Sequence, residues 1–196
     1  MDIQQLKQKV NRYGKDVDEF IPGKRIIVND RMQINYTYTL SEPFGKNFHE
    51  GFNPAFTPVE ILLMGAFEGK YLNDCYKEFP KQWYTEALKA NKLSPTKANP
   101  LLNCFRIKSR QSLKIWQSKG WTKLHSKDKD IRGWFQWYCR YYIGRRVPEV
   151  DIIQIKRWRS FKRHAGQIKS GCTPGDLKCR PKQRQALLQW AYVPFI

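Results

Sequence analysis

The chain has 196 residues, of which 36 are Lys or Arg and 17 are Asp or Glu, so its formal net charge is +19. This charge is extreme for an enzyme of small metabolites, and a hydrophobic content of 41% excludes wholesale disorder. No stretch approaches the about 20 apolar residues of a membrane span, and the N-terminus lacks the apolar stretch of a signal peptide. We expect an intracellular protein of the cytoplasm, nucleoid or nucleus, or one packaged in a virion.

The positive charge is concentrated in the second half of the chain. Residues 101–196 hold 22 of the basic residues and only five acidic ones, and six of the seven tryptophans lie there too. A disordered basic tail would be poor in aromatic residues. The pattern therefore predicts a folded half that presents a positive surface.

The first half begins with a predicted helix and a small hairpin. Spaced apolar residues within 1–22 indicate a short helix, and β-branched and aromatic residues alternate over 25–38 around Asn29-Asp30, which indicates two antiparallel strands. Residues 41–56 have the glycines and prolines of a loop.

A helix start follows at Thr57-Pro58-Val59-Glu60, with a Thr cap, Pro at the first helical position and Glu three residues after the cap. The apolar run to Phe67 predicts a central core helix that Gly69 ends or bends. Pro80 opens a further helical stretch containing Trp83.

From Ser112 to the end the pattern is helical, with breaks at glycines. The predicted helices cover 130–143, 148–169, which is the longest, and 181–192. The expected fold class is mainly α, a compact multi-helix single domain over residues 1–196 with a minor N-terminal β-hairpin. Residues 1–56 form its N-terminal part and residues 57–196 its helical body.

The basic face of the 148–169 helix points most directly to a function. Several of its cations lie within about 120° of one another at 100° per residue, a spacing that lets one helix contact several phosphates. Further cations flank this helix. The residues predicted to bind nucleic acid are Arg145, Arg146, Lys156, Arg159, Lys162, Arg163, Arg180, Lys182 and Arg184. The alternative for any one helix is a solvated charged face.

Aromatic residues beside these cations predict a second kind of contact. Tyr141 and Tyr142 are the candidates for stacking on unpaired bases, because a hydroxyl tolerates the edge of a core. The alternative is that the aromatic side chains of the predicted 130–143 helix all pack in the core.

Four residues are candidates for catalysis on a base or phosphodiester. Glu68, Lys70 and Asp74 combine carboxylates and an amine around a glycine break, and Asp151 is one of few acids in the basic half. The alternative for Asp151 is a capping role near a helix start. The chain has no phosphate-binding loop, dinucleotide fingerprint or zinc-protease motif, so no cofactor is expected.

Cysteine and histidine spacing gives no metal site. The odd number of cysteines, five, favours thiols in a reducing compartment over a disulfide framework. Cys172 and Cys179 flank the turn at Thr173-Pro174-Gly175-Asp176, so their thiols could approach each other.

Three segments carry a resemblance to a known family: 133–142 (GWFQWYCRYY), 154–158 (QIKRW) and 175–192 (GDLKCRPKQRQALLQWAY). On these and on residues 57–60 and 68–71, the chain resembles a family of uncharacterised proteins over about residues 57–192. The resemblance implies no activity and no functional residue.

The leading hypothesis is a DNA- or RNA-binding protein with mainly backbone contacts and no membrane partner. Alternatives are an enzyme that excises or modifies a base, and a structural protein of a ribonucleoprotein or virion. An anionic membrane or acidic protein is a less favoured partner, because the apolar face of the long helix is patterned for a core.

Overall fold

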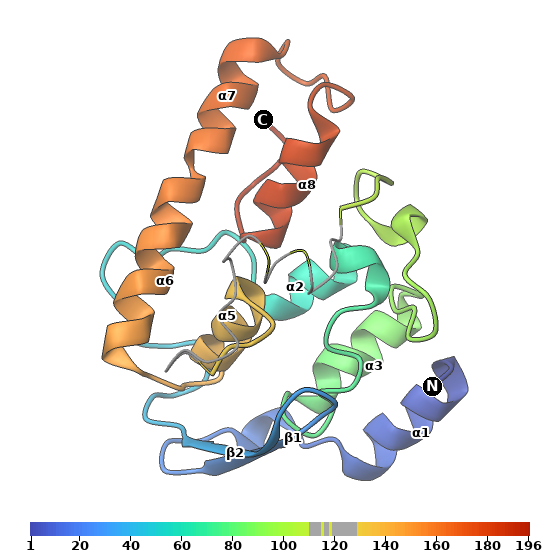
Figure 1. Ribbon diagram of the computed structural model, residues 1–196, viewed down its shortest axis with the longest axis vertical. Coiled ribbons are helices and arrows are strands. Elements are labelled where there is room, and N and C mark those ends of the chain that lie inside the picture. The colour runs from blue at the N-terminus through green and yellow to red at the C-terminus, as the bar shows by residue number, and fades with distance from the viewer. Residues whose placement is uncertain (110–114, 116–117, 119–128) are drawn as a thin grey trace.

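The computed structural model describes residues 1–109, 115, 118 and 129–196. The beginning of the helical stretch predicted from Ser112 therefore lies outside the described residues, except for residues 115 and 118. The fold is mainly α with one two-stranded antiparallel sheet near the N-terminus, as predicted (Figure 1). Helices and hairpin share one hydrophobic core.

The N-terminal elements form where their sequence pattern predicts them. Helix α1 (Ile3–Tyr13) starts at a capping box between Asp2 and Gln5 and buries Leu6 and Val10. Strands β1 (Arg25–Asn29) and β2 (Ile34–Thr39) pair with Ile26 opposite Tyr38, and both of these side chains enter the core. The hairpin prediction is confirmed.

The apolar segment after Thr57 is shorter as a helix than predicted. Helix α2 (Pro58–Leu63) has the expected Thr57 cap, but it ends four residues before Phe67. Gly65, Phe67 and Glu68 all have positive φ, and a Cβ on Gly65 would lie 1.7 Å from the carbonyl oxygen of Leu102. The close approach of the 100–102 turn therefore replaces the last helical turn with the 3-10 turn Ala66–Gly69.

Helices α3 (Lys81–Lys89) and α5 (Trp134–Tyr142) complete the core. Phe52, from the 41–56 loop, lies at the centre of an aromatic cluster. Its ring centroid is 4.9 Å from that of Trp158 and 5.5 Å from that of Trp137, both with tilted or edge-on geometry. The aromatic side chains of α5 therefore pack mainly in the core.

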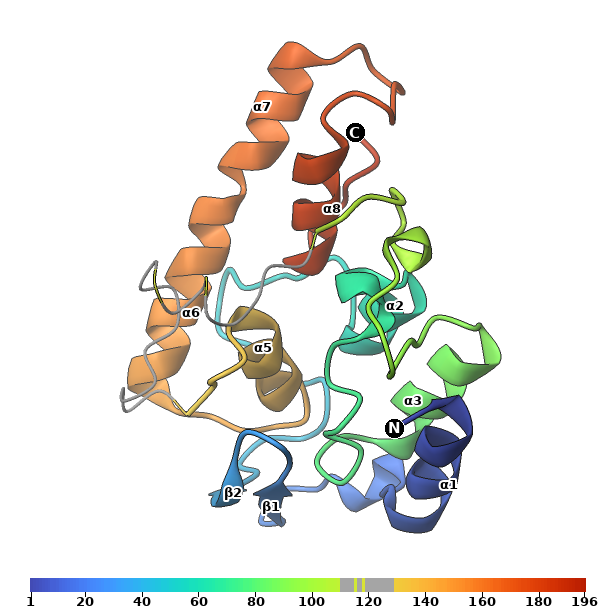
Figure 2. The same ribbon diagram turned by 45° about the vertical axis from the view of Figure 1, so that its right-hand side comes forward.

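The single helix predicted over 148–169 is two helices. Helix α6 (Pro148–Phe161) ends at Lys162, and α7 (Arg163–Gly171) continues in nearly the same direction. Helix α8 (Pro181–Gln189) lies beside α7 in both views (Figure 1, Figure 2). We call residues 148–196 the C-terminal arm.

A disulfide between Cys172 and Cys179 closes the turn between α7 and α8. The sequence left open whether these two cysteines pair, and the Pro174-Gly175 turn brings them together as a disulfide, although the odd cysteine count favoured thiols. Cys75, Cys104 and Cys139 are free thiols. Within the described residues, no helix combines the length and the apolar character needed to cross a membrane.

Candidate nucleic-acid interface

The structure divides the nine cations predicted to contact phosphates into two groups. Six are exposed, and all six belong to the C-terminal arm: Lys156, Arg159, Lys162, Arg163, Arg180 and Lys182. The other three are Arg145, Arg146 and Arg184, and these are buried or half-buried. For these three the prediction of phosphate contacts is corrected, because their guanidinium groups have partners within the protein.

Arg145 is an internal ion-pair partner. Its side chain is 2% exposed, and its Nη2 lies 2.5 Å from Oδ2 of Asp130. Burial by itself lowers the pKa of Arg145, but the pairing with Asp130 outweighs it and raises the pKa. Arg145 cannot reach a phosphate from this position.

Arg184 fastens the C-terminal tail to α8. It is fully buried and donates to the backbone carbonyls of Asp176, Cys179, Pro194 and Ile196 at 2.6 to 3.0 Å. These hydrogen bonds occupy its guanidinium, so it is a structural residue. Arg146 is similar, since it donates to the carbonyls of Tyr141 and Lys46 and its guanidinium lies 3.7 Å from the ring centroid of Tyr141.

The two predicted stacking residues do not present free ring faces. Tyr141 is buried, it accepts a hydrogen bond from the amide of His49, and the guanidinium of Arg146 covers its ring. Tyr142 is half-buried, and its ring packs edge-on against Phe44 at 5.2 Å between centroids. The prediction of base stacking at these two residues is corrected, because both rings belong to the core.

The exposed cations of the C-terminal arm have no acidic partners among the described residues. Every ion pair among the described residues joins side chains that precede the arm. Arg159 donates to the carbonyl of Glu50 and Arg180 to the side chain of Gln183, and both acceptors are neutral. The exposed cations of the arm are Lys156, Arg159, Lys162, Arg163, Lys169, Lys178, Arg180 and Lys182.

The acids of the arm do little to reduce this charge. Only Glu149 and Asp176 are exposed, and Asp176 accepts hydrogen bonds from the amides of Lys178 and Cys179 within its own turn. The arm therefore carries a surplus of positive charge on a surface fixed by three helices and a disulfide.

An open groove of about 500 Å³ lies where α6 meets the chain after α8. It combines cations with aromatic and aliphatic side chains: Ile153, Lys156, Arg157, Ser160, Phe161, Arg163 and Trp190. The helical periodicity of 148–169 assigns Phe161 to the core, and the sequence contains no pattern that pairs it with Trp190. The groove was therefore missed, apart from Lys156 and Arg163.

The four predicted catalytic residues have different hydrogen-bond partners. Asp74 accepts from Arg132 Nη2 at 2.7 Å and from the amide of Arg31, and Lys70 donates to the carbonyls of Pro95 and Thr96. Glu68 is buried with a left-handed backbone and accepts from the amide of Ser109 at 3.0 Å. Among the described residues, no hydrogen bond or ion pair joins these side chains to one another.

Asp151 has a capping role at the start of α6, which is the alternative to catalysis. Its carboxylate accepts from the amide of Val147, at the N-terminus of α6, and from the Trp137 indole, both at 2.8 Å. Burial raises the pKa of Asp151, and these two hydrogen bonds oppose that rise. Its catalytic assignment is corrected, because both oxygens are occupied by structural donors.

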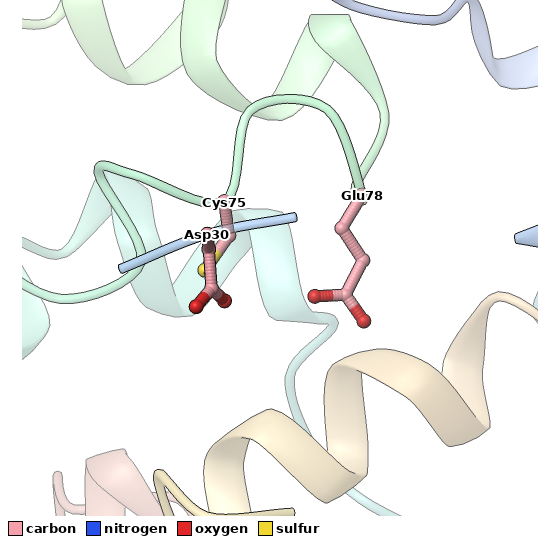
Figure 3. Close-up of side chains that lie close together, drawn as sticks. All are labelled: Asp30, Cys75 and Glu78. Carbon is pink, nitrogen blue, oxygen red and sulfur yellow. The ribbon is translucent and has the colours of Figure 1, made fainter. Parts of the chain in front are cut away.

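A cluster with the residue types of a metal site lies beneath the hairpin. Asp30, from the hairpin turn, and Cys75 and Glu78, from the segment before α3, have potential ligand atoms within 4.8 Å of one another (Figure 3). Arg132 pairs with Asp30 at 3.0 Å, and Arg140 pairs with Glu78 at 2.6 Å. Burial raises the pKa of the Cys75 thiol, which donates to Asp30. Two adjacent guanidinium groups and a neutral thiol do not suit a cation.

These residues belong instead to a buried ion network that the sequence did not indicate. Arg140 is fully buried and contacts Glu78, Asp130 and the side-chain carbonyl of Gln33. Asp130 also pairs with Arg145, and Arg132 joins Asp30 to Asp74. The network holds the hairpin, the segment before α3 and α5 together.

Comparison with protein-family models, curated proteins and solved structures finds no match to this chain. The resemblance of residues 57–192 to a family of uncharacterised proteins stays a prediction.

Proposed function

We propose that the protein binds nucleic acid through the exposed cations of the C-terminal arm, which contact the phosphate backbone. The observation that carries this proposal is that these cations have no acidic partner among the described residues. The buried arginines of the core, by contrast, are matched with carboxylates. Net charge that a fold leaves unmatched on one surface attracts a polyanion.

The spacing of the cations along α6 and α7 supports a repeating anionic partner. Lys156, Arg159 and Arg163 are separated by three and four residues, so they follow one side of the helical rod. At 1.5 Å per residue, Lys156 and Arg163 are about 10 Å apart along the axis. This distance is about three steps of 3.4 Å in one nucleic-acid strand.

Contacts of this kind predict strong salt dependence and little sequence selectivity. Phosphate contacts release condensed counterions, and they do not read base edges. The proposal does not depend on the buried Arg145 and Arg184 or on the half-buried Arg146.

The experiment compares two double variants with the same change in net charge. Lys162→Glu with Lys182→Glu alters the arm, and Lys7→Glu with Lys9→Glu alters exposed positions on α1. Affinity for labelled single-stranded and duplex oligonucleotides is measured by fluorescence anisotropy at about 50 mM salt. We expect the arm variant to lose at least about tenfold in affinity and the α1 variant to lose much less. Equal losses in both variants would overturn the proposed location, and absence of binding by the unaltered protein would overturn the function.

A further inference from the structure

The groove beside α6 has an aromatic wall that is held in place by packing. The rings of Phe161 and Trp190 are stacked, with centroids 4.5 Å apart and planes at 5°. Trp190 also stacks on Trp134 at 4.8 Å, and its carbonyl accepts a hydrogen bond from the Trp158 indole at 2.9 Å. The ring of His164 lies 4.5 Å from that of Phe161, tilted by 51°. The faces of Trp190 are thus occupied by Phe161 and Trp134, and the wall offers a ligand the edges of its rings, in a position fixed before any ligand enters.

Two exposed cations lie at the rim of this wall. Lys156 and Arg163 are separated by two helical turns, with Ser160 between them, and all three line the groove. Among the described residues neither cation makes an ion pair. Arg157 adds a planar guanidinium 5.6 Å from the ring centroid of Trp190. The groove therefore combines positive charge with apolar surface.

This combination suits a ligand with an anionic group and a planar apolar ring. A nucleotide has both, and base contacts with aromatic side chains and guanidinium planes are the usual means of holding unpaired bases. The volume of about 500 Å³ lies within the range of small-ligand sites. In a duplex the bases are paired and stacked inside, so only an unpaired nucleotide can place its ring against Phe161 and Trp190.

We propose that the groove holds one unpaired nucleotide of a single strand, with its base against Ile153 and the ring edges of Phe161 and Trp190, and with phosphates on either side of that nucleotide at Lys156 and Arg163. The inference rests on the proposed function, which it sharpens to a preference for single-stranded over double-stranded nucleic acid. The remaining cations of the arm then contact neighbouring phosphates of the same strand.

The test separates base contacts from phosphate contacts. Three labelled probes are compared by anisotropy: a single strand, a duplex of the same length, and a strand in which abasic sites keep the phosphates and remove the bases. We expect the base-bearing strand to bind about tenfold more tightly than the abasic strand, since contact of a base with aromatic and aliphatic side chains contributes measurably to affinity. An acidic polypeptide, which also lacks bases, should bind no better than the abasic strand.

A matched pair of serine variants places the effect in the groove. Ser160→Leu narrows the groove, and Ser170→Leu is its control on α7; both serines are exposed and donate to a carbonyl of their own helix. Ser160→Leu should remove the difference between base-bearing and abasic strands, and Ser170→Leu should keep it. If Ser160→Leu does not fold, Ile153→Glu and Ile152→Glu provide a second pair, because both isoleucines are exposed but only Ile153 lines the groove.

The outcomes distinguish this inference from the proposed function. Equal affinity for base-bearing and abasic strands would overturn the groove as a nucleotide site while leaving phosphate binding intact. If both Ser160→Leu and Ile153→Glu still prefer the base-bearing strand to the abasic strand, the nucleotide site does not lie in this groove. If the unaltered protein binds none of the three probes, both proposals are overturned.

Discussion

At the residue scale, Arg140 determines how the interior accommodates charge. Its guanidinium is completely buried, and its partners come from positions far away in the sequence: Gln33, Glu78 and Asp130. Two of these partners are carboxylates, so removing the arginine leaves two buried negative charges partly unpaired. The network is costly to break, because each uncompensated ion in the interior is strongly disfavoured.

Replacing Arg140 with Met should lower the free energy of unfolding by about 3 to 5 kcal/mol, the loss expected when one partner of a buried ion pair is removed. The control is Arg25→Met on the exposed face of β1, which should change it by less than about 0.5 kcal/mol. Urea titration followed by circular dichroism measures both. Similar stability of the two variants would show that the network contributes little.

Asp130 should make the stability depend on pH on the acid side. Burial by itself raises the pKa of Asp130, but the ion pairs with Arg145 and Arg140 outweigh it and hold the pKa below its ordinary value. Because the folded-state pKa is lowered, the stabilisation is present above about pH 4 and is lost as the pH falls through the folded-state pKa. The pKa of Asp30 is lowered in the same direction, as pairing with Arg132 overcomes the effect of burial.

The measurement is the free energy of unfolding between neutral pH and about pH 3. The unaltered protein should lose stability mainly below about pH 4, and Asp130→Asn should be less stable at neutral pH with a shallower acid slope. An unchanged acid slope in Asp130→Asn would contradict this assignment.

The sequence indicated which types of residue carry the charge but not which of them are buried. Arginine is seldom fully buried, so Arg145 and Arg184 were assigned to the surface with Lys156 and Arg163. Their acceptors explain the error: Arg145 pairs with a carboxylate 15 positions away, and Arg184 bonds carbonyls of a tail without periodic pattern. Local periodicity contains no information on such partners.

At the element scale, capping residues and helix periodicity predicted the starts of α2, α6 and α8, but not that of α5, which begins at Trp134 instead of Asp130. Thr57-Pro58 starts α2 and Pro181 starts α8, as the sequence indicates. At Lys162 the backbone keeps helical dihedral angles (φ −53°, ψ −24°), so the break between α6 and α7 is a small local change. The premature end of α2 has a different cause. The close approach of Gly65 to Leu102 is tertiary, and single-sequence patterns cannot show it.

The disulfide at the turn between α7 and α8 should stabilise the arm. Cys172 and Cys179 are seven positions apart, and closing a loop of this size reduces the entropy of the unfolded chain by an amount worth about 2 kcal/mol. The double variant Cys172→Ser with Cys179→Ser should lose about that much stability in urea titration. Cys104→Ser, which alters an exposed free cysteine, should have no such effect.

The same double variant should keep its helices at neutral pH, because Gln183 contacts Gln167 and Arg184 fastens the tail without help from the disulfide. Loss of helical circular dichroism in the absence of denaturant would contradict this. If the double variant is as stable as the unaltered protein, then this turn has its native conformation in the unfolded chain even without the disulfide.

At the scale of the whole molecule, charge is distributed in two ways. In the part of the fold that precedes the C-terminal arm, the buried Arg140 and Arg145 pair with carboxylates, and the aromatic side chains of α5 pack in the core. In the C-terminal arm, exposed cations face solvent and have no acidic partners among the described residues. The asymmetry of charge along the sequence thus becomes a set of exposed cations on the arm that contains α6, α7 and α8. Figure 2 shows α8 beside α7, which continues from α6.

The most direct test is the salt dependence of binding, measured by anisotropy with a labelled single strand and purified protein free of nucleic acid. Five or so phosphate contacts predict that affinity falls by about a hundredfold between about 50 and 200 mM salt. The Lys162→Glu and Lys182→Glu double variant should show a shallower slope, and the α1 variant should match the unaltered protein. Absence of binding at the lower salt concentration, or affinity that does not change with salt, would contradict the account.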